Sequence, residues 1–504
     1  MFRPVDTFLN NITMYRLVLY GLSVIAVYAF AAAALGYIPY TVLQLVESLV
    51  LLLAICYGSN YLCAKVCGAP VNTESQFITA FILFFILVPA KSLEEYVVLV
   101  CAALLAMGSK YLVAIKHKHV INPVAIALVL LSLWGRGEGI WWVGSAVMLP
   151  LVFVLSLLVL RKLRRFALGF SFLITALIST VVVGVVHALP LTDVIRTFFI
   201  SGPVFFFMGI MLTEPLTTPP TKKLQVGYGV IVGLLFGAQF SWGPVYSSPE
   251  LSLFVGNIFS YIVSPKYRLK LFLKQKQQLA TNIFEFVFTT SQKVSFTPGQ
   301  YFEWTLPHAH ADQRGMRRYF TIASSPSESD IRLGVRIEPA RSSSFKNALM
   351  QLEPGASLMA SSLSGDFVLP SDPHIKLAFI AGGIGVTPFR SMIASLKDKG
   401  EKRDIVFFYA NRVENEIAYQ ELFDSVKELG IKMVYLVNKP FSTTWSGGYT
   451  GLLTKEIIAK EAADLTERDF YISGSHTMVM IFKRVLRECG VPSSSIHTDF
   501  FPGL

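Results

Sequence analysis

Charged residues are scarce in this sequence. Only 15% of its 504 residues are Asp, Glu, Lys or Arg, whereas 53% are hydrophobic, and the mean hydropathy is +0.54. So few charged side chains cannot solvate the whole surface of one water-soluble globule of this size. We therefore expect a lipid bilayer to cover at least one part of the chain.

Cysteine and histidine are also scarce where metal or haem sites would need them. The five cysteines, at positions 56, 63, 67, 101 and 489, form no paired CxxC sets. We therefore expect no disulfide framework, no iron–sulfur cluster and no metal site. Two stacked haems would need four inward-facing histidines, and the chain before residue 265 contains only His117, His119 and His187. We expect no haem.

The net charge of +11 does not indicate a nucleic-acid partner. Nucleic-acid binding needs cations clustered on one soluble face or arm. In the first half of this sequence the cations instead stand singly or in short groups between apolar runs. We therefore expect no nucleic acid among the partners.

Apolar runs dominate the first half of the chain and predict a polytopic α-helical membrane bundle. Ten runs are long enough to span, or nearly span, a bilayer. They cover residues 15–37, 41–62, 76–90, 93–115, 121–134, 141–160, 166–188, 197–213, 225–240 and 248–264. The runs 76–90 and 197–213 are short and contain Pro or Gly, which predicts broken or re-entrant helices.

Lysine and arginine are retained in cytoplasmic loops, so their positions predict the orientation. With ten crossings, only Lys91, Arg136 and Arg196 fall in outer loops, and the other cations of this half fall inside. We therefore expect a multi-pass protein of the cell (inner) membrane with both termini cytoplasmic. The segments 79–89 and 201–215 are both Phe-rich and end at proline. An inverted repeat of five segments each is one explanation, and chance similarity is the other.

The composition becomes that of a soluble protein near residue 266. Alternating apolar stretches at 267–273, 283–289, 301–306 and 331–337 predict an antiparallel β-barrel. After Pro373, strand-like and helix-like segments alternate, which predicts a parallel α/β sheet. The expected fold is multi-domain, with a membrane domain at 1–265, a barrel at 266–372 and an α/β domain at 373–504.

The strongest local motif is the run Arg318-Tyr319-Phe320-Thr321. It resembles the R-x-[YF]-[ST] flavin motif of the ferredoxin–NADP reductase superfamily. The order of its companions, 298–301, Ser342-Ser343-Ser344 and 365–370, is similar to that family too. The resemblance implies that FAD is bound by Arg318 at its diphosphate, by Phe320 over its ring, by Thr321 at its N5 edge and by the N–H groups of the helix after Ser342, Ser343 and Ser344.

A glycine-rich turn follows the first strand of the predicted α/β domain. Gly382, Gly383 and Gly385 would let a dinucleotide approach the backbone, and Thr387 would cap the next helix. With the segments 409–412 and 471–475, this turn resembles the NAD(P) domain of the same superfamily. Arg412 could meet a 2′-phosphate or be a surface residue, so the choice between NADH and NADPH stays open.

Two predictions concern the transfer site itself. The family often has C-G-P where this chain has Ser473-Gly474-Ser475, so a hydroxyl replaces the thiol beside the nicotinamide. The end of the chain resembles the family's C-terminal aromatic near the flavin, which implies that role for Phe500 or Phe501. The expected catalytic residues are Thr321, Ser473, Phe500 and Phe501.

The membrane half resembles the B subunit of the sodium-pumping NADH:quinone reductase and the D subunit of the Rnf complex. The similar segments are 118–123, Ser201-Gly202 with the helix after it, and 213–219. Those subunits attach FMN to a threonine, but Val204 here has no oxygen for that bond. The resemblance therefore implies non-covalent FMN or riboflavin, with Asn122, Ser201, Gly202 and Thr213 as candidate contacts.

These observations predict an NAD(P)H-dependent flavin oxidoreductase. A hydride from cytosolic NAD(P)H would reach FAD, and a membrane flavin would carry electrons to an extracytosolic acceptor such as a flavoprotein. Two alternatives stay open: an NAD(P)H:quinone reductase whose electrons stay in the bilayer, and a redox-regulated ion or solute transporter.

Overall fold

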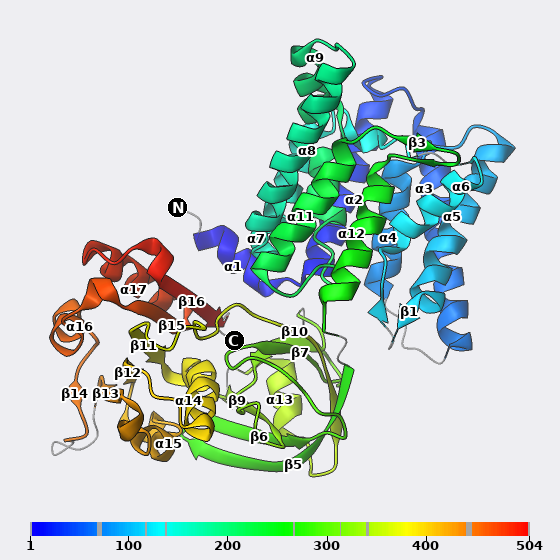
Figure 1. Cartoon of the computed structure of the whole chain (residues 1–504). Helices are drawn as coiled ribbons and strands as arrows, with labels where there is room; N and C mark the ends of the chain where they lie inside the picture. Colours follow the sequence, from blue (N-terminus) through cyan, green and yellow to red (C-terminus); the bar gives the residue numbers. More distant parts are fainter. Residues whose placement is uncertain are drawn as a thin grey trace. The chain divides into compact units, whose positions relative to one another are not determined.

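The computed structural model describes residues 3–67, 73–115, 118–136, 139–265, 268–312, 314–338, 342–439 and 446–501. The chain forms two compact units, Met1–Ser264 and Pro265–Leu504 (Figure 1). We call them the helical unit and the C-terminal unit. The further boundary expected at 372/373 falls inside the C-terminal unit and stays a prediction.

The helical unit consists mainly of apolar helices around one core. Its longer helices are α1 (Arg3–Asn11), α2 (Met14–Ala34), α3 (Val42–Val66), α4 (Thr73–Ile86), α5 (Leu93–Leu112), α6 (Pro123–Leu133), α7 (Leu149–Leu163), α8 (Phe166–Val186), α11 (Lys222–Gly237) and α12 (Pro249–Val263). Short pieces complete it: β1 (Ala114–Ile115), β2 (Lys118–His119), η1 (Trp142–Gly144), β3 (Ser241–Trp242) and β4 (Val245–Tyr246). Helix α11 packs against both α8 and α12.

Among the described helices, four are long and apolar enough to cross a membrane, namely α2, α3, α5 and α8. A fifth span results if one bent pair is counted as a single crossing. The other predicted runs form shorter helices, and the run 141–160 begins as η1 and becomes α-helical only at Leu149. Ten full crossings therefore stay a prediction.

The predicted break in the run 197–213 is confirmed. The helix Leu191–Ser201, made of α9 (Leu191–Arg196) and η2 (Thr197–Ser201), is bent by 50° against Val204–Met211, made of α10 (Val204–Phe206) and η3 (Phe207–Met211). The break falls at Gly202-Pro203, where proline cannot donate a helical hydrogen bond. Both η2 and η3 are π-helical, a rare form that occurs mostly as single turns within α-helices and is frequent at functional sites.

The C-terminal unit begins with a curled antiparallel sheet of six strands in the order β8-β7-β10-β5-β6-β9. The strands are β5 (Arg268–Ala280), β6 (Ile283–Thr289), β7 (Tyr301–Thr305), β8 (Arg317–Thr321), β9 (Ile331–Arg336) and β10 (Ser357–Ser364). Helix α13 (Ser344–Met350) packs its apolar side chains into the core of this sheet. We call this sheet with α13 the barrel lobe.

A second sheet of six strands, all parallel, has the order β14-β13-β12-β11-β15-β16. Its strands are β11 (Leu377–Gly382), β12 (Ile405–Asn411), β13 (Ile431–Val437), β14 (Tyr449–Thr450), β15 (Asp469–Ser475) and β16 (Ile496–Phe501). The helical segments are η4 (Gly383–Val386), α14 (Thr387–Lys399), η5 (Glu414–Glu416), α15 (Gln420–Asp424), η6 (Lys427–Leu429), α16 (Lys455–Glu461), η7 (Leu465–Glu467), α17 (His476–Glu488) and η8 (Ser493–Ser495).

The parallel sheet is covered on both faces. One apolar core contains residues of α14 and α15, and a separate core contains residues of α16 and α17 (Figure 1). Burial of both faces explains the nearly continuous apolar strands at 377–381 and 405–409. We call this sheet with its helices the α/β lobe.

Candidate functional site

The predicted flavin motif lies on β8, which pairs antiparallel with β7. Phe320 is half-buried and its ring lies 5.7 Å from that of Phe345 in α13. Tyr319 faces the other way and donates its hydroxyl hydrogen to Glu303 at 2.8 Å. Arg318 and Phe320 thus share the inner side of the strand, as alternation requires.

The Arg318 guanidinium is held by an internal anion. Its Nη2 donates to both carboxylate oxygens of Asp312, at 2.8 and 3.0 Å. Burial raises the pKa of Asp312, but Arg318 and the N–H of Arg314 outweigh that effect and keep this pKa below its ordinary value. The carboxylate of Asp312 therefore binds the guanidinium that the flavin resemblance assigns to the FAD diphosphate.

Further cations surround this position. Burial, together with the charges of Arg314, Arg336 and Arg318, lowers the pKa of Lys346 in α13 to about 8, although Glu338 acts in the opposite direction. Such an excess of positive charge favours binding of a phosphate anion. The sequence analysis did not identify Asp312 or Lys346 as residues of this site. The alternation of acidic and basic residues at 312–318, beside the flavin motif, is the feature that could have indicated Asp312.

The three serines predicted to bind the diphosphate open α13, which has seven residues. The Ser343 hydroxyl caps the helix by accepting the Lys346 N–H at 3.4 Å. The Ser344 N–H donates to Asp312 at 3.3 Å, and its hydroxyl accepts the Asp312 N–H at 2.9 Å. The N–H groups expected to be free are thus partly taken by the chain itself.

Buried polar atoms without a partner test whether the described residues suit FAD. Thr321 Oγ1, Ser342 Oγ and Arg318 Nε are all buried and make no hydrogen bond within the described part of the chain. Such atoms are uncommon in folded proteins, because each loses its hydration without replacement. Three residues predicted to contact FAD therefore retain unused hydrogen-bonding capacity, which fits the cofactor.

The glycine-rich turn connects β11 to α14 and lies next to the end of β15. A Cβ atom on Gly385 would lie 2.5 Å from the carbonyl oxygen of Ser473 and 2.6 Å from Gly474 Cα. Gly383 has a φ of +52°, a conformation that glycine adopts without strain. A Cβ on Gly382 would meet only the side chain of Met478, at 2.2 Å.

The prediction that Thr387 caps α14 is wrong. Thr387 is the first residue of the helix, Val386 is its N-cap, and the Thr387 hydroxyl donates to the carbonyl of Ile384 at 3.3 Å. The cause is η4, because a 3₁₀ turn leads straight into the helix and leaves no extended residue at the cap. Its methyl group instead lies 2.8 Å from where Gly334 of β9 would carry a Cβ.

Ser473 lies near the carboxyl end of β15, and ligands of such parallel sheets bind at the carboxyl ends of the strands. From β11 the chain runs outward through β12, β13 and β14, and it then returns to β15 on the other side of β11, so the strand order reverses beside β11. Ser473 is fully buried, and its hydroxyl has no partner among the described residues. This unused hydroxyl fits a nicotinamide carboxamide beside the turn.

Arg412 lies at the end of β12 with a side chain 63% exposed, and it contacts Glu416 at 3.3 Å. Glu416 also binds Arg336 at 2.9 Å, and Arg336 Nη1 lies 3.7 Å from where Gly383 would carry a Cβ. The structure therefore connects Arg412 to the glycine-rich turn through one carboxylate and one arginine.

The predicted aromatic residues Phe500 and Phe501 belong to β16. Their backbones pair with Gly474 and Ser475 of β15, which places this strand end beside the segment that contains Ser473. Their side chains lie outside the described part of the structure, so their predicted role stays a prediction.

In the helical unit, the buried residues Asn122 and Thr213 belong to one polar cluster. Asn122 Nδ2 donates to Glu214 at 2.8 Å, and Arg165 donates to the carbonyl of Thr213 at 2.6 Å. The backbone N–H of Asn122 donates to Asn257 at 2.8 Å. We call Asn122, Arg165, Thr213, Glu214 and Asn257 the Glu214 cluster.

Ser201 and Gly202 lie elsewhere in the helical unit. Ser201 is exposed, and Gly202 packs against η1, where a Cβ on Gly144 would lie 2.8 Å from the Gly202 carbonyl carbon. The four predicted membrane-flavin contacts are therefore not gathered in one place by any described interaction.

Comparison with known proteins identifies part of the chain. Residues 379–484 match the family model "Oxidoreductase NAD-binding domain". The chain is 26% identical over 210 residues to a flavohemoprotein of Bacillus subtilis, covering 41% of this chain and 51% of that protein. It is 26% identical over 223 residues to the glycine betaine monooxygenase reductase subunit of Chromohalobacter salexigens, covering 43% and 59%.

A stachydrine N-demethylase reductase subunit of Rhizobium meliloti is 26% identical over 227 residues, covering 44% of this chain and 63% of that protein. The chain thus spans between half and two thirds of these relatives. Among solved structures, the FAD/NAD-binding domain of a Vibrio cholerae nitric oxide dioxygenase is 18% identical with a TM-score of 0.42, covering 47% of this chain and 99% of that one. Residues 379–484 thus match an oxidoreductase NAD-binding domain, and the C-terminal unit that contains them is similar in sequence to flavohemoproteins and to oxygenase reductase subunits.

Proposed function

We propose that this protein takes a hydride from cytosolic NAD(P)H onto FAD in its C-terminal unit and passes the electrons across a membrane. In this proposal a non-covalent flavin in the helical unit carries the electrons, and an acceptor on the far side receives them. The match of residues 379–484 to an oxidoreductase NAD-binding domain supports the reductase chemistry, and the path through the helical unit is the further step of this proposal.

In the C-terminal unit, one group of residues would bind FAD and a second group would bind the nicotinamide dinucleotide. FAD, when bound, accepts a hydride and can return its electrons singly. Arg318, Lys346 and the serines before α13 would hold the FAD diphosphate, Phe320 would pack against the flavin ring, and Thr321 would offer its hydroxyl to the flavin. Gly382, Gly383 and Gly385 admit the nicotinamide dinucleotide, and Ser473 orients its ring.

The observation that carries the membrane step is the Glu214 cluster. Asn122, Thr213 and Asn257 are almost fully buried in a unit of apolar helices, and they lie beside the partly buried carboxylate of Glu214 and guanidinium of Arg165. Polar and ionisable groups are expensive in an apolar bundle and mark ligand or ion paths there. A flavin ring offers carbonyl oxygens and ring nitrogens that such groups can bind.

The first experiment counts and identifies the flavins released by acid from the purified full chain. The proposal expects FAD plus a second flavin, with both visible spectra bleached by NAD(P)H without oxygen. One flavin per chain would remove the proposed carrier. Asn122→Ala should then lower the content of the second flavin without changing the FAD content.

A second candidate function follows from the relatives whose names describe reductase subunits. In that case FAD would pass electrons to a soluble partner on the cytosolic side, and the helical unit would serve as an anchor. Full activity with an acceptor confined to the NAD(P)H side, and none across the membrane, would favour it.

A further inference from the structure

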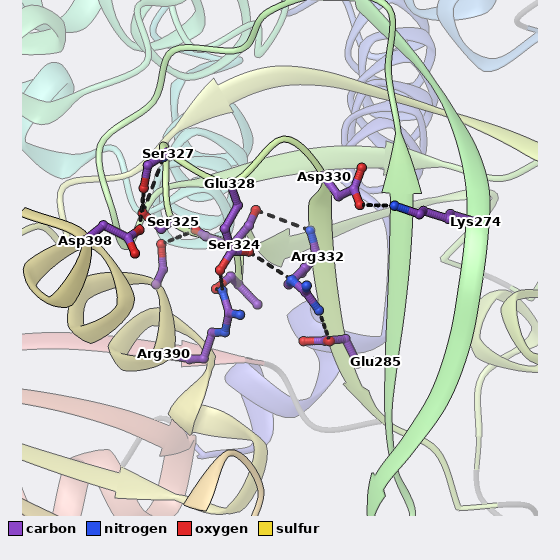
Figure 2. A network of polar contacts seen from close by, with 12 residues as sticks. Lys274, Glu285, Ser324, Ser325, Ser327, Glu328, Asp330, Arg332, Arg390 and Asp398 are labelled. Atoms are coloured by element: carbon purple, nitrogen blue, oxygen red, sulfur yellow. Dashed lines mark hydrogen bonds and ion pairs between the residues drawn. The ribbon is translucent and has the colours of Figure 1, made fainter. Parts of the chain in front are cut away.

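Two adjacent residues of α14 connect the α/β lobe to the barrel lobe. Arg390 Nη1 donates to the carbonyl of Ala323 at 2.9 Å and forms an ion pair with Glu328 at 2.7 Å. The Ser391 hydroxyl donates to the carbonyl of Ser324 at 2.6 Å. Figure 2 shows Arg390 reaching from α14 to the segment that contains Ser324 and Glu328.

These contacts are shielded from water. Arg390 is 8% exposed and Ser391 is fully buried. Hydrogen bonds to a charged donor in a buried place are short and directional, so they restrict motion between the groups they join. The two lobes are therefore tied together at this point by consecutive residues of one helix.

The contacts of Arg390 and Ser391 with the barrel lobe lie between the two predicted reaction sites. On the barrel side, Ala323 is two residues beyond Thr321, and its N–H donates to the carbonyl of Arg332 at 2.9 Å. On the other side, Arg390 is three residues beyond Thr387, which begins α14 directly after the glycine-rich turn. A shift of α14 against Ala323 would therefore move the turn relative to Thr321.

The same arginine belongs to a chain of ion pairs. Glu328 also binds Arg332 at 2.9 Å, and Arg332 binds the buried Glu285 at 2.6 Å (Figure 2). Arg332 reaches the carboxylates but donates no side-chain hydrogen to the carbonyls of Ala323 and Ser324 among the described contacts. It therefore provides a matched comparison for Arg390.

We infer that Arg390 and Ser391 are positioning residues for hydride transfer, because they fix the distance between the nicotinamide turn and the flavin edge at Thr321. This inference rests on the reductase part of the proposed function. Hydride transfer needs the reacting atoms about 3–3.5 Å apart, and a misplacement of about 1 Å can slow an enzyme about 100-fold. Neither residue needs to touch FAD or NAD(P)H for this role.

The test compares Arg390→Met, Arg390→Lys and Ser391→Ala with Arg332→Met in the full-length, FAD-loaded protein. Four quantities are measured: FAD per chain, melting temperature, the KM for NAD(P)H, and the rate of flavin bleaching at saturating NAD(P)H. We expect Arg390→Met to keep its FAD and KM while bleaching slows at least tenfold. Any long-wavelength flavin–nicotinamide absorbance should weaken with it. Arg390→Lys should recover part of the rate, and Ser391→Ala should slow it less.

Arg332→Met should lower the melting temperature but bleach at the rate of the parent. If flavin bleaching slows equally in Arg332→Met and Arg390→Met, both residues only stabilise the fold and the inference is overturned. An unchanged bleaching rate in Arg390→Met would overturn it too. If Arg390→Met does not fold, Ser391→Ala decides by the same criteria. A parent protein that NAD(P)H cannot bleach would instead contradict the proposed function itself.

Discussion

Arg318 binds Asp312 through one guanidinium nitrogen, which donates to both carboxylate oxygens at 2.8 and 3.0 Å. The same carboxylate accepts the N–H of Ser344 at 3.3 Å. Asp312 thus joins two groups that the flavin resemblance assigns to the FAD diphosphate. FAD could use the unpaired Nε of Arg318 directly, but it would compete with this carboxylate for Nη2 and for the Ser344 N–H, so the affinity for FAD should reflect a competition between two anions.

The competition predicts opposite effects of two substitutions. Arg318→Ala should lower the FAD content of the purified protein, because the clamp is lost. Asp312→Asn should raise the affinity of the FAD-free protein for FAD about tenfold, because a hydrogen bond to a charged group contributes about 1.5–3 kcal/mol. Quenching of flavin fluorescence during titration measures both. Asp330→Asn is the control, because it alters a carboxylate that is paired with Lys274 instead. Weaker FAD binding by Asp312→Asn would contradict the competition and show that Asp312 supports the FAD site.

Lys346 predicts how FAD binding depends on pH. Its pKa is lowered to about 8 by burial and by the nearby cations, so the ammonium loses its proton as pH rises through that range. A bound diphosphate would stabilise the charged form and raise this pKa, so binding takes up a proton above pH 8. The affinity for FAD should therefore fall between about pH 7 and pH 9.5.

Lys346→Met should bind FAD more weakly at pH 7 and lose most of this pH dependence. Lys274→Met, at an exposed lysine, should keep it. A parent protein whose FAD dissociation constant is the same at both pH values would remove Lys346 from the site.

The glycine-rich turn predicts a contrast between two alanine substitutions. A Cβ at Gly385 would press on the backbone at Ser473 and Gly474, which cannot move aside without shifting β15. Gly385→Ala should therefore raise the KM for NAD(P)H at least tenfold or abolish flavin reduction. A Cβ at Gly382 meets only the flexible end of Met478, so Gly382→Ala should raise the KM for NAD(P)H less than Gly385→Ala does. Equal kinetics in both variants would contradict the close approach of the turn to β15.

A further prediction concerns acid stability. Hydrogen bonds from Arg468, and then from Lys376, lower the pKa of Asp464 to about 2. A carboxyl group whose folded pKa lies below its unfolded value of about 4 stabilises the fold above pH 4, and this contribution disappears as pH falls toward 2. The midpoint of urea unfolding of the C-terminal unit, followed in the full chain, should fall across this range.

Asp464→Asn should make that fall shallower by removing the titrating group. Glu467→Gln removes an exposed carboxylate that also contacts Lys376, and it should leave the pH profile nearly unchanged. A profile of Asp464→Asn that matches the parent would exclude Asp464 as a source of acid sensitivity.

Much of the C-terminal fold could be predicted because its signals are local. The apolar strands at 377–381 and 405–410 and the glycine-rich turn follow from burial and backbone geometry alone. Strand β10 was missed because its alternation is interrupted: the register shifts between Ser361 and Ser364, and Ser362 has a φ of +54°. The helix-like stretch that follows the strand at 405–410 forms only the short helix α15 followed by η6, since propensity does not specify where a short helix ends.

The contacts of the site were harder to predict because they join distant segments. Nothing local indicates that Asp312 meets Arg318 and Ser344, or that Arg390 reaches Ala323 across 67 positions of sequence. In the helical unit, hydropathy located the apolar segments but not their helical lengths, which depend on tertiary packing in the broken segment and around the Glu214 cluster.

The most direct test of electron transfer across the membrane uses sealed vesicles containing the purified chain, with ferricyanide trapped inside and NAD(P)H added outside. Only molecules whose C-terminal unit faces outward can react, so impermeable external NAD(P)H selects one orientation. We expect the trapped ferricyanide to be reduced and to lose its colour. Asn122→Ala should slow this loss, while ferricyanide added outside is still reduced. Rapid reduction of external ferricyanide with no loss of the trapped dye would contradict the central claim.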